Sequence, residues 1–388
     1  MKQGWEIKKL GEVAHISPSK SEVKTFALNP MDMVSFLPME DLTIGRTFVH
    51  PNKQKTLSEV EGSYTYFKEG DVLLAKVTPC FENGKLAIAK GLCNNIGFGS
   101  SEYIVIRPMQ HIVNSQYLIY LLQTNAFRNG GRTLMIGACG LKRLPKPYVA
   151  NYELPVPSLA EQERIVEILD REFERIDALK ANAEKSLQHA KDLFQSALKQ
   201  ELQPKEGWEP KTIRELSEEL FAGGDVPKHA LSKTITTEYN VPIYANAVEQ
   251  DGLYGYTNVA RVNKPSITIA GRGSGTGYII ERTEKYLPVV RLIVIVPQTQ
   301  IVRNRFLYYA LKSLDIKSNG SAIPQLTVPM IAQYIVNYPT LTAQDVIIGV
   351  LDELNERCKT LEENYRKTIA LCDNMKQALL RKAFNGEL

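Results

Sequence analysis

Two long stretches of the chain carry apolar residues in alternating steps of four and three. In residues 340–388 this seam runs through Ile347, Leu351, Leu354, Cys358, Leu361, Tyr365, Thr368, Cys372, Met375 and Leu379. Residues 158–204 carry a second seam at Ile165, Leu169, Phe173, Ile176, Leu179, Ala183, Leu187, Ala190, Phe194 and Ala197. Such spacing is typical of α-helices that pack along a heptad seam. It predicts two long helices, with Cys358 and Cys372 as small seam hydrophobes rather than nucleophiles.

The residues between these stretches follow a different pattern, in which short apolar runs alternate with turn residues. The runs are DVLLAKV and EYIVIRP in the first half, and SITIAG and RLIVIVP in the second. Each half also has an amphipathic helical stretch, at 112–123 and at 301–312. This combination predicts a mixed α/β domain with a curved sheet in each half. The order of the strands does not follow from the pattern.

The sequence at the beginning of the predicted helices occurs twice. PSLAEQERIVEILD at 157–170 returns as PTLTAQDVIIGVLD at 339–352, with six of fourteen positions identical. GWEIKKLGEV at the start likewise returns as GWEPKTIREL at 207–216, and residues 138–198 align with 320–380 without a gap. Residues 20–100 barely match their counterpart. The repeat predicts two domains, 1–157 and 205–339, each followed by a spacer helix, 158–204 and 340–388.

Connectivity restricts how these parts can be arranged. The first helix leaves one domain and reaches the other through the short linker QPKEGWE. If the second helix is to bury its seam on the first, it must run back antiparallel. We therefore expect an α+β fold in which two mixed α/β domains are joined by an antiparallel coiled coil with an internal pseudo-two-fold repeat. Helices of about 35–45 residues would span about 50–65 Å at 1.5 Å per residue.

The charge of the chain is unevenly distributed. The formal net charge is only +4. Between Glu102 and Glu153, however, there are no acids, and the bases are Arg107, Arg128, Arg132, Lys142, Arg143 and Lys146. After Glu284 the second domain repeats this excess, whereas both predicted helices are net acidic. One basic stretch could be an ordinary solvated surface, but two at matching places favour a polyanionic partner such as DNA.

Residues with an evident catalytic arrangement are missing. The sequence AGRGSGTG at 270–277 matches neither GxxxxGK[ST] nor GxGxxG, so a turn between strands is the more probable interpretation and a backbone contact to phosphate the alternative. The five histidines form no pair with metal-ligand spacing, and the five scattered cysteines indicate reduced thiols in the cytoplasm. No secretion signal and no apolar run long enough for a transmembrane helix are visible. We therefore expect no cofactor and no metal.

Basic and hydrogen-bonding side chains in the predicted loops are the candidates for contact with DNA. They are Lys76, Thr78, Asn83, Lys85, Arg132, Lys142, Arg143 and Lys146 in the first half, and Arg272, Ser274, Thr276, Lys317, Asn319 and Gln325 in the second. The gap-free alignment makes Arg143 and Gln325 equivalent. Arginine suits bidentate contact with guanine, and glutamine with adenine, so this pair could read different bases. A phosphate contact for Arg143 and a surface position for Gln325 are at least as plausible.

At this point the chain resembles a known family, the specificity (S) subunits of type I restriction-modification enzymes. The resemblance rests on GWE near the start of each half, the P-x-L-x-x-Q helix beginnings at Pro157 and Pro339, and the closing ALLRKAFNGEL. It implies two target-recognition domains, each reading half of a split DNA sequence. It also implies binding of two methyltransferase (M) and two restriction-translocation (R) subunits, with no chemistry in this subunit. Glu161, Gln162 and Gln344 at the helix beginnings are then the candidates for partner binding.

Three hypotheses remain to be compared. The first is a non-catalytic DNA-sequence reader that also scaffolds its partners. The second is a stand-alone enzyme acting on DNA, which should show a cofactor loop. The third is a coiled-coil adaptor without sequence-specific DNA reading, against which the two basic domains argue. We favour the first.

The lack of a cofactor or phosphoryl-transfer motif gives a direct prediction. The isolated, pure chain should neither methylate nor cleave DNA, because it has no group to carry out either reaction. Incubating it with labelled adenosylmethionine and plasmid DNA should give no labelled and no broken product, whereas adding the methyltransferase subunit should restore labelling. Methyl transfer by the chain alone would contradict the prediction.

Overall fold

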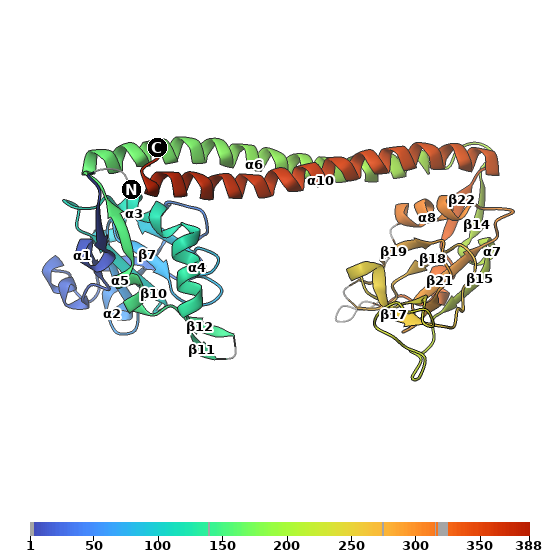
Figure 1. Ribbon diagram of the computed structural model, residues 1–388, viewed down its shortest axis with the longest axis horizontal. Coiled ribbons are helices and arrows are strands. Elements are labelled where there is room, and N and C mark those ends of the chain that lie inside the picture. The colour runs from blue at the N-terminus through green and yellow to red at the C-terminus, as the bar shows by residue number, and fades with distance from the viewer. Residues whose placement is uncertain (1–3, 139, 274, 315, 317–324) are drawn as a thin grey trace. The chain divides into compact units, whose positions relative to one another are not determined.

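The computed structural model describes residues 4–138, 140–273, 275–314, 316 and 325–388. The backbone forms two compact units (Figure 1), and each has its own hydrophobic core. Unit 1 comprises Met1–Ala183 with Lys367–Leu388, and unit 2 comprises Glu184–Arg366. Both contain a mixed α/β domain and parts of two long helices, α6 (Leu159–Glu201) and α10 (Leu341–Asn385). The predicted α+β fold class is confirmed.

Unit 1 is organised around a five-stranded sheet in the order β2-β10-β7-β8-β4. Its strands are β2 (Ala14–Ile16), β4 (Phe48–Val49), β7 (Val72–Ala75), β8 (Leu86–Ala89) and β10 (Tyr103–Pro108). Alternate residues of β7 face different cores, with Val72 and Leu74 in one and Leu73 and Ala75 in the other. A strand covered on both faces is apolar throughout, which explains the continuous run DVLLAKV.

The other elements of unit 1 surround this sheet. A four-stranded sheet, β5-β3-β9-β6, consists of β3 (Met33–Leu37), β5 (Lys53–Thr56), β6 (Thr65–Lys68) and β9 (Ile96–Gly99). Two-stranded pairs are β1 (Glu6–Lys9) with β13 (Glu153–Val156), and β11 (Ile136–Ala138) with β12 (Leu141–Arg143). The short helices are α1 (Leu10–Val13), η1 (Lys20–Phe26), α2 (Leu57–Val60), η2 (Cys93–Asn95), α3 (Ser115–Leu122), α4 (Asn125–Leu134) and α5 (Lys146–Asn151).

Unit 2 has a four-stranded sheet in the order β15-β21-β18-β19. Its strands are β15 (Ser217–Ala222), β18 (Ser266–Ile269), β19 (Ile279–Arg282) and β21 (Ile293–Pro297). The sheet β17-β16-β20 consists of β16 (Val241–Tyr244), β17 (Leu253–Thr257) and β20 (Leu287–Pro288), and β14 (Glu209–Thr212) pairs with β22 (Ile335–Tyr338). The helices are α7 (Ile213–Leu216), η3 (Glu249–Gly252), α8 (Asn304–Ser313) and α9 (Val328–Ala332).

The framework of the two units is the same. The antiparallel order β2-β10-β7 in unit 1 matches β15-β21-β18 in unit 2. In each unit the strand that begins at the glutamate of GWE pairs antiparallel with the strand before the P-x-L motif. These pairs are β1 with β13 and β14 with β22. The repeated motifs are therefore neighbours in space. The second sheets differ, with four strands in unit 1 and three in unit 2, where the sequences have diverged.

A buried glutamine fixes the start of α6 in unit 1. The Gln162 side chain is completely buried. Its amide oxygen accepts a hydrogen bond from Asn114 N at 2.8 Å, and its amide nitrogen donates to Ile112 O and Pro157 O, both at 2.9 Å. Both amide protons are therefore used. The side chain ties the long helix to the backbone that leads into α3.

Unit 2 repeats this arrangement at the start of α10. Gln344 is also completely buried. It accepts from Arg303 N at 2.8 Å and donates to Ile301 O at 3.0 Å and to Pro339 O at 2.9 Å. The glutamine of the P-x-L-x-x-Q motif thus has one structural role, which is to attach a long helix to the domain before it.

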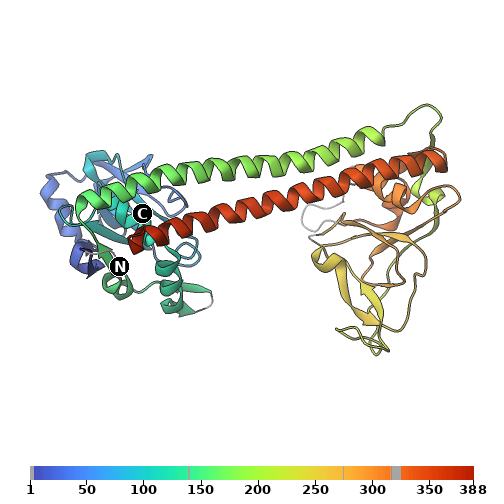
Figure 2. The same ribbon diagram turned by 45° about the horizontal axis from the view of Figure 1, so that its top comes forward.

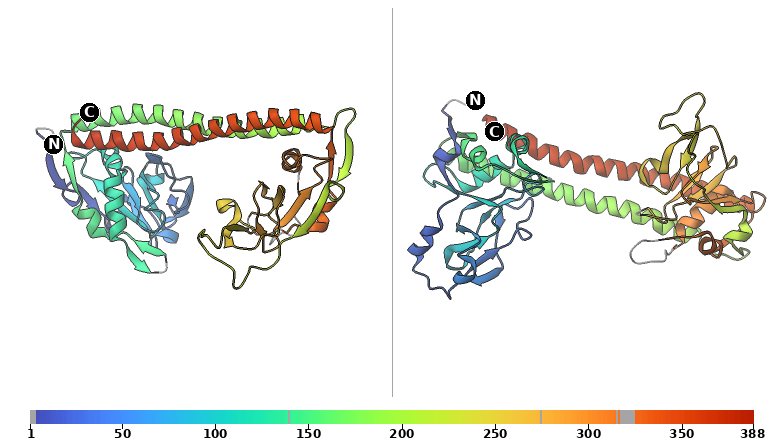
Figure 3. Two further views of the ribbon diagram at one scale, coloured as in Figure 1. Left: turned by 45° about the vertical axis from the view of Figure 1, so that its right-hand side comes forward. Right: turned by 90° about the horizontal axis from the view of Figure 1, so that it is seen from below.

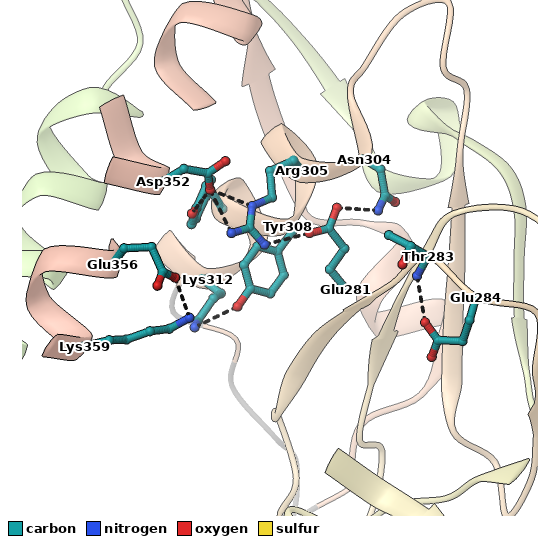
Figure 4. Close-up of polar contacts among 11 residues, drawn as sticks. Glu281, Thr283, Glu284, Asn304, Arg305, Tyr308, Lys312, Asp352, Glu356 and Lys359 are labelled. Atoms are coloured by element: carbon teal, nitrogen blue, oxygen red, sulfur yellow. Dashed lines mark hydrogen bonds and ion pairs between the residues drawn. The ribbon is translucent and has the colours of Figure 1, made fainter. Parts of the chain in front are cut away.

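A second polar link follows two turns later along each long helix. In unit 1 the Tyr120 hydroxyl donates to the Asp170 carboxylate, and in unit 2 the Tyr309 hydroxyl donates to Asp352. Unit 2 adds Arg305 of α8, whose guanidinium lies between Asp352 of α10 (2.8 Å) and Glu281 of β19 (2.7 Å) (Figure 4). This arginine joins the long helix, the short helix and the sheet in one ion-paired cluster.

The two long helices run antiparallel. In unit 1, Asp177 Oδ1 pairs with Lys376 Nζ at 2.5 Å, and Lys180 Nζ pairs with Asp373 Oδ1 at 2.7 Å, so rising numbers on α6 meet falling numbers on α10 (Figure 2). This confirms the predicted direction. The helix pairs are also part of the cores, as with Leu169 and Leu380 in unit 1.

The predicted seam is only partly buried. Its positions Leu179, Leu361 and Met375 are 47%, 40% and 40% exposed. Leu198 is completely buried, although the predicted seam included its neighbour Ala197 instead. Two paired helices can cover only one side of each seam residue, so the flanks remain open where no domain packs against them. The heptad pattern identified the helices correctly but overstated their burial.

The buried glutamines give a test of stability. Replacing Gln162 or Gln344 by alanine should lower the free energy of unfolding by at least about 1–3 kcal/mol, because an unpaired buried backbone group costs that much and each change leaves three. Urea denaturation followed by circular dichroism would measure the shift in midpoint. Gln188→Ala on the exposed face of α6 is the matched control. Equal midpoints for all three variants would contradict the proposed role.

Candidate nucleic-acid interface

The segment after β7 brings several predicted residues together. Residues 76–78 lie beside β12, since Leu144 N donates to Lys76 O at 2.7 Å and Thr78 N donates to Lys142 O at 2.9 Å. Val77 and Arg143 form a β-bridge in the same place. The structure therefore gathers Lys76, Thr78, Lys142 and Arg143, which are far apart in the sequence, at one edge of unit 1.

Beyond this edge β11 and β12 form a two-stranded ribbon. Their register pairs Ile136 with Arg143 and Ala138 with Leu141. All six residues of the two strands are exposed. The ribbon projects from unit 1 on the side away from α6 (Figures 1 and 3). A narrow projecting ribbon is a shape that can enter a DNA groove.

Thr78 anchors the ribbon through its hydroxyl group. The Thr78 Oγ1 donates to Gly140 O at 2.8 Å and accepts from Lys142 N at 2.9 Å. A hydroxyl engaged in both directions has little capacity left for a ligand. Thr78 therefore holds the ribbon in place, and its contact with DNA stays a prediction.

Arg143 is engaged in a bidentate ion pair. Its Nε lies 3.0 Å from both oxygens of Glu102, and its Nη2 lies 2.7 Å from Glu102 Oε1. The hydrogen bond from Arg143 is the main reason that the pKa of Glu102 lies below its usual value. This pair therefore stabilises the fold above the unfolded pKa of about 4.3 and is lost as the pH falls through the lower folded pKa.

Lys76 lies beside the same carboxylate. Its ammonium group donates to Ser101 O at 2.8 Å and is 3.9 Å from Glu102 Oε2. Burial lowers the pKa of Lys76, against the opposing effect of Glu102. Lys76 and Arg143 thus share one acid, so the positive charge at this edge exceeds the negative charge.

Unit 2 has the equivalent edge. Leu326 N donates to Gly271 O at 2.8 Å, and Arg272 forms a β-bridge with Gln325. Because Leu326 aligns with Leu144, the two bridges bear out the alignment that makes Arg143 and Gln325 equivalent. Thr276 lies nearby, with its hydroxyl donating to Gly273 O at 2.7 Å. The predicted residues Ser274, Lys317 and Asn319 lie outside the described residues.

The remaining predicted side chains of unit 1 differ in accessibility. Asn83, Arg132, Lys142 and Lys146 are exposed. Lys85 is partly buried, and its ammonium group donates to Met39 O at 3.0 Å. Arg132 lies in the last turn of α4 and Lys146 begins α5, so both flank the ribbon in sequence. These exposed bases fit a surface that contacts phosphates.

Some residues of this region were not among the candidates for DNA contact that were selected from the sequence. Arg128 on α4 is half-buried, burial lowers its pKa, and its Nε has no partner among the residues that the structure describes. Leu134, Ile136 and Leu141 are exposed apolar side chains on and next to the ribbon. The alternation in TLMIGACGL could have indicated a strand pair, but its short length gave only a weak signal.

The prediction for the helix beginnings needs a correction. Gln162 and Gln344 were expected to bind partners, but both are buried and fully hydrogen bonded within their own unit. They cannot contact a partner directly in this fold. Glu161 is partly exposed and accepts from Arg164 Nε at 2.8 Å. Its part in partner binding stays a prediction.

Within residues 4–138, 140–273, 275–314, 316 and 325–388, no three His, Cys, Asp or Glu side chains are grouped as a metal site would require. Among the helices of that same part of the chain, none has the length and apolarity needed to span a membrane.

Comparison with known proteins shows which family the chain belongs to. Residues 2–189 and 205–371 both match the family model described as "Type I restriction modification DNA specificity domain". The chain belongs to this family. The double match reflects the repeated framework, because each match contains one of the two α/β domains.

Individual relatives agree with the family. The specificity subunit of the type I restriction enzyme EcoEI from Escherichia coli is 35% identical over 196 residues, which are 50% of this chain and 32% of that protein. A putative type I specificity subunit, S.MpnORF507P from Mycoplasma pneumoniae, is 30% identical over 212 residues, 55% of this chain and 58% of the relative. The matched part thus spans about a third of the Escherichia coli protein's length.

Solved structures show the same fold. One is described as "Structural basis underlying complex assembly and conformational transition of the type I R-M system" and matches with a TM-score of 0.85, 18% identity and coverage of 100% of this chain and 99% of the other. The HsdS subunit from Thermoanaerobacter tengcongensis matches with a TM-score of 0.62, also at 18% identity, over 100% and 98% of the two chains. At this identity the likeness concerns the fold.

The ion pair gives a test of what Arg143 does in a specificity subunit. If Arg143 positions the ribbon, Arg143→Ala and Glu102→Ala should weaken binding of cognate DNA to a similar extent, and the double variant should be little worse than either. Fluorescence anisotropy of the complex with its methyltransferase subunit, on cognate and single-base variant duplexes, would measure this.

Direct base reading would give a different result. Arg143→Ala alone would then relax specificity at one base pair, at a cost of about 1–3 kcal/mol, while Glu102→Ala would leave that base pair fully discriminated. A phosphate contact would instead give a uniform loss on all duplexes with Arg143→Ala only, and a smaller dependence on salt. Lys8→Ala is a matched charge control, because it removes a lysine of β1 that is far from Arg143 in the sequence.

Proposed function

We propose that this chain is the DNA sequence-specificity subunit of a type I restriction-modification complex. Each α/β domain, 1–157 and 205–339, reads one half of a bipartite target. The observation that carries the proposal is the duplicated edge within a type I specificity framework. In unit 1 it presents Arg143 at the same backbone position where unit 2 presents Gln325. Two equivalent edges with different side chains are what two different half-sites require.

The charge of the domains supports DNA as the ligand. Unit 1 has no acid between Glu102 and Glu153, and Arg132, Lys142 and Lys146 are exposed in that stretch. Phosphate contacts from such bases supply affinity and register, while side chains at base edges supply specificity. The proposed division is that exposed lysines and arginines hold the duplex and that the ribbon region reads it.

The helices serve assembly in this proposal. Exposed apolar residues occur along them at Leu193, Val346, Val350 and Leu371. Apolar side chains on a long exposed helix suit a protein partner. We propose that the helices, 158–204 and 340–388, bind two methyltransferase subunits and, with them, the restriction-translocation subunits. These partners carry out methylation and cleavage in the cytoplasm, where the chromosome lies, and this chain supplies no catalytic group.

The helices also set the distance between half-sites. Half-sites read from one face of a duplex have centres about 34 Å, or 10–10.5 bp, apart. We propose that the gap between the two half-sites is non-specific because net acidic helices, which repel phosphates, connect the domains. The number of residues in α6 and α10 therefore determines the length of the gap.

The methylated positions in a genome test this proposal. Cells that express the chain with its methyltransferase subunit should carry one bipartite methylated sequence with a constant gap. Inserting seven helical residues after Ala183 and another seven after Arg366 preserves the heptad phase and adds about 10 Å to each helix. The gap should lengthen by about three base pairs at 3.4 Å each, and both half-sites should stay the same.

The control places the same seven residues in the linker 203–206, outside both helices. That insertion should leave the gap unchanged, because it lengthens the chain without lengthening a helix. An unchanged gap in the helix variant would refute the spacing role. A continuous methylated sequence, or none, would refute the proposed function.

A further inference from the structure

One face of the β11–β12 ribbon is apolar except for Arg143. Residues opposite each other in an antiparallel pair lie on the same face, as do alternate residues along a strand. The register therefore places Ile136, Ala138 and Leu141 together, with Arg143 at the inner end. Ile136 is 72% exposed and Leu141 is 49% exposed. Leu134, which ends α4 just before the ribbon, is 53% exposed.

This exposed face is held in a fixed position. Met135 and Leu144, which flank the two strands, are both buried in the core of unit 1. Thr78 and the Glu102–Arg143 ion pair fix the outer edge of β12, as described above. A short hairpin is marginally stable alone, so these anchors keep an apolar surface in water that a free loop would bury or fold away.

Gly137 allows the two strands of the ribbon to lie close together. A Cβ atom added to Gly137 would lie 2.2 Å from Leu141 O and 2.8 Å from Lys142 Cα, so any larger residue would push the strands apart. Gly137 also has a φ of +154°, which side chains rarely allow. Among the described residues of the two strands, this glycine and Lys142 are the ones on the opposite face. The result is a narrow element with one apolar face and one lysine behind it.

The surroundings favour nucleic acid as the occupant. A protein partner for an apolar patch does not require basic surroundings, but here Lys142 lies on the opposite face of the ribbon, and the exposed Arg132 and Lys146 flank it in sequence. No acid occurs between Glu102 and Glu153. The major groove of DNA admits a two-stranded ribbon, and the thymine 5-methyl group is the apolar group that it displays. Charge and apolarity together match that groove.

We propose that the β11–β12 ribbon enters the major groove of one half-site, where Ile136 and Leu141 recognise thymine methyl groups by apolar contact. Arg143 is then a positioning residue, which fixes the ribbon through Glu102. The proposal rests on the proposed function and adds to it the residues and the chemical group that determine specificity in unit 1.

The test removes the methyl group from the DNA instead of changing the base pair. Replacing a thymine of the unit 1 half-site by deoxyuridine leaves base pairing intact. Each contacted methyl should lower the affinity of the complex with its methyltransferase subunit by about three- to five-fold, as expected for one buried carbon. Deoxyuridine in the other half-site is the internal control and should have a smaller effect.

Variants of the ribbon complete the test. Ile136→Ala with Leu141→Ala should bind the thymine duplex more weakly than the original chain does, and should no longer distinguish it from the deoxyuridine duplex. Met31→Ala, an exposed apolar residue elsewhere in unit 1, is the matched control. Unchanged thermal unfolding of the variants would show that the ribbon residues are not needed for folding.

The outcomes separate the two proposals. If the original complex does not distinguish cognate from scrambled DNA, the proposed function fails. If it does, but deoxyuridine and the ribbon variants change nothing, the proposed function survives and this inference is wrong. A unit 1 half-site without A·T pairs would also overturn it. Increased fluorescence of 2-aminopurine placed at the site would show that the ribbon inserts between bases instead of contacting the groove. That result would also overturn this inference.

Discussion

The structure depends on one buried amide that occurs twice. Gln162 and Gln344 each satisfy two carbonyl groups and one N–H group that would otherwise be buried without partners. These groups belong to the loop before a short helix and to the proline two residues before a long one. Since the backbone of that loop would pay a desolvation cost without the amide, the direction of each long helix relative to its own domain is fixed. Tyr120 with Asp170, and Tyr309 with Asp352, add a second point of attachment.

Much of this framework could be predicted from the sequence. The heptad spacing located both long helices, and the repeat indicated a framework shared by the two halves, because both signals extend over many residues. The continuous apolar runs became β7, β10, β18 and β21, as strands covered on both faces should. The strand order could not be predicted, since it depends on pairings between distant segments such as β2 with β10. The openness of the seam at Leu179 and Leu361 also depends on what packs nearby, which a periodic pattern does not contain.

The site was harder to predict than the fold. Sequence comparison identified the equivalence of Arg143 and Gln325, but it could not show that Arg143 already has Glu102 as a partner, because those residues are 41 positions apart. Thr78 and Lys85 were selected for their polar groups, which the structure uses internally. Gln162 and Gln344 were selected from a motif that proved to be buried. In each case the residue type indicated a polar contact, but the sequence did not indicate where the side chain points, because tertiary contacts determine its direction.

Each long helix belongs to two hydrophobic cores. The core of unit 1 takes Leu169 from α6 and Leu380 from α10, and the core of unit 2 takes Leu198 from α6 and Leu351 from α10. A chain that ended after α6 would therefore leave uncovered the surface on which Leu380 and Ala383 pack. Leu198 aligns with Leu380, so the matching segment would be the end of α6 from a second copy. A half-length chain would accordingly need to assemble as a symmetric homodimer that exchanges helices. In this chain both helix exchanges occur within one polypeptide, so the two halves can differ in sequence and still remain attached to each other.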